Sequence, residues 1–229
     1  MKIGIACAPL ALAAALACMG GGSHRPETVA ETDFGRLSPA EMQPVNAART
    51  ESDAARDGVA RADLHLQEAQ HEADYAKAEQ TAVRADQERA AAAAKAAKES
   101  GDPGDTARAQ ELASTAQLHQ QAAEAHAAYA NQLVQARQAG VAAAKAEQAR
   151  AEAALERAKL TALEQAQIPA ATKYDPARFD ATVAQRTREA AEARTRASQA
   201  DHAALQALGT WQTLQQRWQA RAQGPIQRG

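Results

Sequence analysis

The side chains with the most scope for chemistry are four histidines: His65 and His71, then His119 and His126. The second pair is spaced by one heptad and therefore shares one face of a helix. That spacing is about two helical turns, which is farther than a single metal ion usually bridges, and no cysteine or acidic residue completes a ligand set. We therefore expect no metal site and no cofactor here, and we interpret the histidines as solvated or packed side chains of a helix.

Trp211 and Trp218 are the second chemical feature, and they occupy core-type positions of a heptad repeat. We expect them to pack against an alanine-rich surface near Val83, Ala90 and Leu118, because large side chains fill the space that small ones leave. The alternative is that both tryptophans contact a partner protein or a second copy of the chain. The sequence contains no nucleophile with its base, no phosphate-binding loop and no glycine-rich cofactor turn, so we do not expect an enzyme.

Composition indicates long, thin helices. Of the 229 residues, 45% are hydrophobic but only 3% are aromatic, and alanine supplies most of the hydrophobic share. The mean hydropathy is -0.52. A globular core of this size needs more large apolar side chains, whereas alanine is the best helix former. The net charge of -2 gives no general attraction to nucleic acid, which we exclude as a partner.

A heptad ladder of small apolar residues predicts an all-α coiled coil. Seven-residue spacing keeps one stripe of a helix facing a partner helix. The cluster of glycine and proline at 100–105 is the strongest turn signal in the chain, so residues 38–166 are expected to form an antiparallel hairpin of two long helices. The first helix begins at Ser38 or only at Pro44. The ladder consists of Ala48, Ala55, Ala62, Ala69, Ala76, Val83, Ala90 and Ala97.

A third long helix is expected over residues 174–223. Asp175 is placed as its N-cap, Pro176 follows at the first helical position, and Tyr174 and Phe179 are spaced for a hydrophobic staple. Its heptad positions run without a slip from Phe179 to Trp218. Whether this helix packs within the chain or between chains stays open, and residues 224–229 are expected to fray.

Gly140 provides a test of the hairpin register. If the two helices fold about the turn, Gly140 lies opposite Leu66, the bulkiest residue on its stripe. We predict that glycine is needed there to leave room for leucine. On an exposed face, glycine would instead only lower the helix propensity.

The N-terminus predicts export. Residues 1–17 contain one lysine and a short apolar run, which is typical of a secretory signal peptide. Small residues, Ala15-Leu16-Ala17, precede Cys18. Cys7 lies within this leader, so Cys18 would be the single cysteine of the mature protein and has no internal disulfide partner.

Ala15-Leu16-Ala17-Cys18 resembles the lipobox of bacterial lipoproteins, although alanine replaces the usual leucine three residues before the cysteine. The resemblance implies that Cys18 is acylated, with palmitate-type chains, and that the membrane is a partner through this anchor. The alternative is an ordinary signal-peptidase site that Cys18 merely follows. Met19, which is not aspartate, implies outer-membrane sorting facing the periplasm. Residues 18–37 are interpreted as the lipidated cysteine and a flexible tether.

These features together favour a lipid-anchored, non-enzymatic structural or interaction protein of the bacterial cell envelope, with an envelope protein, the cell wall or a second copy as partner. In architecture the chain resembles murein-lipoprotein-type helical lipoproteins, but it ends in Gln227-Arg228-Gly229 rather than in the lysine that those proteins join to peptidoglycan. One alternative is an adaptor-like helical component of an envelope transport assembly. Another is a soluble exported binding protein or chaperone.

Overall fold

The computed structural model describes residues 27–34 and 37–224. It contains three long helices, α1 (Gln43–Ser100), α2 (Pro103–Gln165) and α3 (Pro176–Gln223), and two short 3-10 helices, η1 (Glu31–Phe34) and η2 (Pro169–Lys173). The described residues include no strand. The prediction of an all-α fold built from a helical hairpin and a third long helix is therefore confirmed. The predicted signal peptide, Cys18 and the tail after Gly224 lie outside the described residues.

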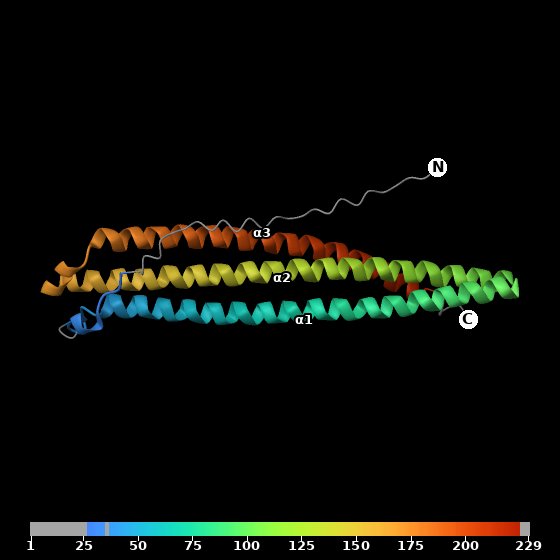
Figure 1. The fold of residues 1–229 in the computed structure, drawn as a ribbon, viewed down its shortest axis with the longest axis horizontal. Coiled ribbons are helices and arrows are strands. Elements are labelled where there is room, and N and C mark those ends of the chain that lie inside the picture. Colours follow the sequence, from blue (N-terminus) through green and yellow to red (C-terminus); the bar gives the residue numbers. More distant parts are fainter. Residues whose placement is uncertain (1–26, 35–36, 225–229) are drawn as a thin grey trace, which may run out of the picture.

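The three helices lie side by side along one long axis (Figure 1). The chain runs out along α1, returns antiparallel along α2, and runs out again along α3, which packs on α2. Near the base α3 lies on the side of α2 away from α1, and toward the tip it crosses behind α2 in the view of Figure 1. The 58 residues of α1 and the 63 of α2 correspond to about 87 Å and about 95 Å at the helical rise. We call the end near η1 and η2 the base, and the end at the α1–α2 turn the tip.

The turn at the tip is built from residues that local chemistry favours there. Gly101 adopts a left-handed conformation with φ 65° and caps α1 by donating its N–H to the carbonyl of Ala97. Asp102 is the N-cap of α2, and its carboxylate accepts from the N–H groups of Gly104 and Asp105. The predicted turn is thus confirmed.

The α1 ladder faces α2. Its members from Ala69 to Ala97 are buried, while Ala48, Ala55 and Ala62 are half-buried. On α2 the buried residues do not follow the single pair of stripes that α1 shows, because α2 has α1 on one side and α3 on the other. One buried α2 ladder is made of Ala109, Ala116, Ala123 and Ala130.

The base holds a hydrophobic cluster of large side chains. Val29 and Phe34 are buried against Leu160, Leu163 and Phe179. The backbone N–H of Val29 donates to Glu156, 2.8 Å away. Residues 27–34 were expected to belong to a flexible tether, and this expectation is wrong for them, because these two side chains complete a hydrophobic cluster that α2 and α3 leave open.

The predicted cap of α3 is confirmed. The carboxylate of Asp175 accepts from the N–H of Ala177, and the rings of Tyr174 and Phe179 meet edge to face with centroids 6.2 Å apart. At the same end of the rod, α1 begins at Gln43 with Pro44 in its first turn. Ser38 and Glu41 form the reciprocal hydrogen bonds of a capping box in the turn that precedes α1.

The prediction that Gly140 makes room for Leu66 is wrong. A Cβ atom at position 140 would meet no neighbouring atom within 4 Å. The hairpin folds about the expected turn, but the side of α2 that carries Gly140 leaves open space at this position. Glycine is therefore not required there for packing.

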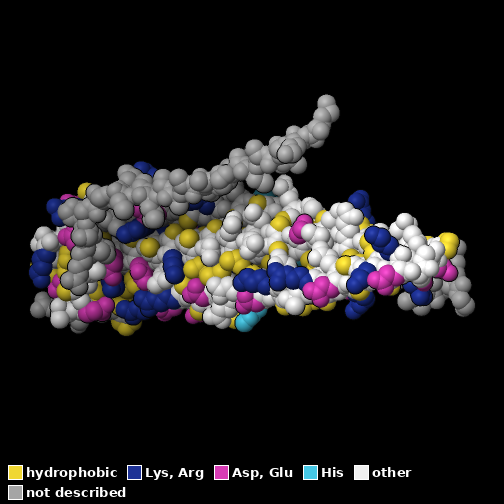
Figure 2. Space-filling model, turned by 45° about the vertical axis from the view of Figure 1, so that its right-hand side comes forward, with side chains coloured by type: hydrophobic (Ala, Val, Ile, Leu, Met, Phe, Trp, Pro, Cys, Tyr) yellow, Lys and Arg dark blue, Asp and Glu magenta, His cyan; other side chains and the backbone are white. Residues whose placement is uncertain are grey.

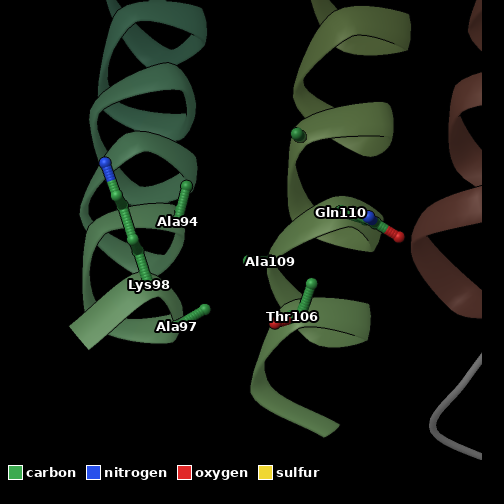
Figure 3. Close-up of a pocket in the computed structure, with 7 residues that line it drawn as sticks. Ala94, Ala97, Lys98, Thr106, Ala109 and Gln110 are labelled. Atoms are coloured by element: carbon green, nitrogen blue, oxygen red, sulfur yellow. The ribbon is translucent and has the colours of Figure 1, made fainter. Parts of the chain in front are cut away.

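The tip extends beyond α3. Arg221, near the end of α3, lies 3.9 Å from Glu111, so the last turns of α1 and the first turns of α2 continue without a third helix. Figure 3 shows the shallow groove between them, with Ala94, Ala97 and Lys98 on α1 and Thr106, Ala109 and Gln110 on α2. Among the described helices, none combines the length and apolar character that a membrane span requires.

Candidate functional site

The three helices bring together a ladder of histidines, carboxylates and tryptophans in the distal half of the rod. Each helix contributes side chains at seven-residue intervals: Glu72, Glu79 and Asp86 from α1, His119 and His126 from α2, and Trp211 and Trp218 from α3. Because the intervals match, one register aligns every rung. We refer to these seven residues as the ladder site.

His126 is the best-buried member, with 0% of its side chain exposed. Its Nδ1 lies 2.5 Å from Glu79 and its Nε2 lies 2.8 Å from Glu72. Both ring nitrogens of His126 therefore have a carboxylate partner. A neutral imidazole has only one N–H to donate, whereas the imidazolium form donates from both nitrogens.

His119 repeats the arrangement one heptad earlier in α2. Its Nδ1 lies 2.8 Å from Asp86, and its Nε2 lies 3.9 Å from the second oxygen of Glu79. The other oxygen of Asp86 is 3.1 Å from Arg89. Glu79 thus stands between the two rings and links both rungs of the ladder site.

The two tryptophans cover the histidines from α3. Trp211 stacks on His126 and Trp218 stacks on His119, each with ring centroids 4.1 Å apart and with planes inclined by 5° and 8°. An indole face attracts a cation placed over it, and the attraction is larger when the cation is desolvated. The ladder site therefore joins α1 to α3 through the imidazole rings of α2.

Two tyrosines surround the more buried rung. Tyr75 of α1 meets His126 edge to face at 5.7 Å, and Tyr129 of α2 lies 5.4 Å from Trp211. Burial raises the pKa of Tyr129, the carboxylate of Glu72 raises it further, and Arg137 opposes both effects. Tyr129 therefore stays a neutral phenol in this partly desolvated setting.

The expected positions of the tryptophans were partly right. They do pack on the hairpin, but the surface that they cover is formed by histidine rings. The contact of both histidine rings with carboxylates of α1 was not predicted from the sequence. The sequence does carry a signal for this arrangement, since Glu72, Glu79 and Asp86 repeat the seven-residue spacing of the histidines.

The ladder site is built for packing and charge pairing. Within residues 27–34 and 37–224, no group of three or more histidine, cysteine, aspartate or glutamate side chains is arranged to hold a metal ion. His65 and His71 are not part of the ladder site: His71 is exposed, and His65 pairs with Glu68 at the rim of the depression beside Trp211. Two open depressions flank the stacked rings, one beside Trp211 with Glu68 and Arg137, and one beside Trp218 with Arg89 and Arg108.

No protein-family model, no characterised protein and no solved structure matches this chain.

Proposed function

We propose that the protein is a lipid-anchored, non-enzymatic structural and interaction protein of the bacterial cell envelope. The observation that carries the proposal is the position of residues 27–34 at the base, the end opposite the tip. An acyl group on Cys18 would be separated from this packed segment by only eight residues. The hairpin would then hold its tip about 85–95 Å from the anchored end, a distance set by the lengths of α1 and α2.

The surface of the rod is consistent with a protein that works by contact in an aqueous compartment. Figure 2 shows positive and negative side chains interspersed along the visible face, with hydrophobic side chains between them. Mixed charge keeps such a surface soluble while leaving room for specific polar contacts. The cell wall, another envelope protein or a second copy are the partners that this proposal admits.

The anchor is tested by replacing each cysteine of the full chain in turn. Cys18→Ser should release the protein from the membrane fraction and remove the mass of the lipid, because serine has no thiol to form the thioether bond to a diacylglyceryl group. Cys7→Ser, within the leader, is the matched control and should behave as the unmodified chain. The proposed lipid anchor would be refuted if Cys18→Ser stayed in the membrane fraction and its mass differed from that of the unmodified chain only by the substitution itself.

A second candidate function, an adaptor-like component of a transport assembly, is favoured by one feature. The tip is a bare two-helix coiled coil that α3 leaves uncovered, and small residues line its groove (Figure 3). A photocrosslinking residue at Lys98 or Gln110 should capture a membrane channel if the tip docks on one. The same residue at the exposed Ala128, far from the tip, is the control. Crosslinks to cell-wall material, or crosslinks from all three positions alike, would argue against the adaptor.

A further inference from the structure

We propose that the distal half of α3 is a proton-controlled latch. Imidazolium rings at His119 and His126 hold Trp218 and Trp211 against the hairpin, and this part of α3 separates from α2 when the rings lose their charge. The base of α3 stays docked in both states.

Hydrogen bonding at His126 supplies the first argument. Both ring nitrogens face carboxylate oxygens within hydrogen-bond distance, and the ring is fully buried. If the ring were neutral, one of its buried nitrogens would present a lone pair to an ionised carboxylate. The docked arrangement is therefore satisfied only when it binds an additional proton.

Charge balance supplies the second argument. The charged or titratable groups that face the two rings are Glu72, Tyr75, Glu79, Asp86 and Arg89 of α1 and Tyr129 of α2. From α3 only the indoles face them, while the nearby Arg221 and Asp201 pair with Glu111 and Arg137 of α2. The three carboxylates carry three negative charges, and Arg89 compensates one of them. Imidazolium forms of the two rings would neutralise the remaining two. With neutral rings, the negative charge of the carboxylates beside the stacked rings would be uncompensated.

The third argument concerns how weakly the distal half of α3 is otherwise held. The buried residues of α3 are Phe179, Ala190, Ala193 and Ala204, all in its first two thirds. Beyond Ala204 the contacts are half-buried, and among the described residues Nε1 of Trp211 and Oε1 of Gln215 are buried with no hydrogen-bond partner. The two ring stacks, together with the contacts of Arg221 with Glu111 and Ser114, hold this segment.

The direction of the pH effect follows from proton binding. Because docking as proposed requires charged rings, it is favoured at low pH and weakens as pH rises. Histidine is the side chain that changes its charge between about pH 5 and 8. Because each bound proton changes the docking equilibrium by at most tenfold per pH unit, we expect a total change of roughly tenfold or more between about pH 5 and pH 9.

Hydrogen exchange of the full chain measures this change. The readout is the protection of amides in residues 205–223 divided by the protection of amides in residues 180–193 of the same helix, each corrected for the intrinsic exchange rate. The ratio should fall by about tenfold or more over the pH range. The chain has two tryptophans, both in the latch, so their fluorescence emission should shift to longer wavelength as the pH rises. The helical circular dichroism signal should stay constant over the same range.

Two variants decide whether the histidines are responsible. His126→Gln, which keeps a polar side chain but cannot become charged, should remove most of the pH dependence, whether its distal α3 is docked or released throughout. His202→Gln, at an exposed position of α3, should titrate like the unmodified chain. A protection ratio and emission that stay constant from about pH 5 to 9 in the unmodified chain would overturn the latch. So would an undiminished pH dependence in His126→Gln.

Discussion

The indole of Trp218 lies flat on the imidazole of His119, with ring centroids 4.1 Å apart and planes inclined by 8°. The same pairing recurs one heptad away along both helices, where Trp211 covers His126. Such stacks pair a specific heptad of α3 with a specific heptad of α2. Alanine contacts do not provide this selection, since one alanine resembles the next seven residues away. The position of α3 along the rod therefore depends strongly on these two rings.

Trp218→Ala should lower the free energy of unfolding by about 1–3 kcal/mol, below the range for fully buried tryptophan because this side chain is half-buried. Thermal unfolding followed by circular dichroism measures the change. Leu205→Ala, at a position 61% exposed on the same helix, is the control and should stay within about 0.5 kcal/mol. Equal effects of the two substitutions would show that the stack contributes nothing.

His126 and Glu79 should be energetically coupled. A double-mutant cycle with His126→Ala and Glu79→Gln is expected to give a coupling energy of about 1–3 kcal/mol, because the pair is buried. The control is the surface pair His65 and Glu68, whose ring nitrogen and carboxylate are 3.0 Å apart but largely exposed. Its coupling should be below about 0.5 kcal/mol. Additive effects at the buried pair would contradict a charge-assisted hydrogen bond there.

Replacing Gly140 or Gly101 by alanine should change the free energy of unfolding in opposite directions. Gly140→Ala should raise the free energy of unfolding by about 0.5–1 kcal/mol, because the added methyl group meets open space and alanine favours the helix. Gly101→Ala should lower it by about 1–2 kcal/mol, because its φ of 65° is strained for any residue with a side chain. Chemical denaturation of both variants checks the signs. A destabilised Gly140→Ala would mean that the position is packed after all.

Phe34→Ala should free residues 27–34 from the base. Removing the ring opens a cavity beside Leu160, Leu163 and Phe179 and takes away the surface that the ammonium group of Lys159 covers at 5.7 Å. We expect a loss of about 2–4 kcal/mol and rapid amide exchange in this segment. Thr32→Ala, at an exposed position of the same segment, serves as the control. Unchanged exchange in Phe34→Ala would show that the ring does not hold the segment in place.

The carboxyl group of Glu41 should report on the turn before α1. The backbone N–H and then the hydroxyl of Ser38 hold its pKa below the ordinary value of about 4.5. Because this pKa is lower in the folded state, the carboxylate stabilises the fold at pH values above the ordinary pKa. This stabilisation is lost as the pH falls through the lowered pKa. Ser38→Ala removes the hydroxyl hydrogen bond, so the pKa of Glu41, followed by NMR titration, should move part of the way back toward 4.5. No movement would show that the hydroxyl plays no part.

Much of this fold is determined locally and was therefore readable from the sequence. The alanine ladder, the glycine at the tip turn and the aspartate cap of α3 act through neighbours within one or two turns of the chain. Helix propensity, capping and seven-residue periodicity need no knowledge of distant residues. For that reason the three long helices and the hairpin agree with the sequence-based expectation.

Only the tertiary structure determined which residues of different helices lie opposite each other. Glu79 and His126 are 47 residues apart in the chain, and only the register of the hairpin turns two seven-residue repeats into one buried charge network. The docking of Val29 and Phe34 has no periodic signal, since two apolar side chains suffice when they fill a gap that other helices create. The open space beside Gly140 likewise depends on which side of α2 faces its neighbours. Periodicity determines which face of a helix is buried, whereas the shape and charge of the partner surface decide which residues meet there.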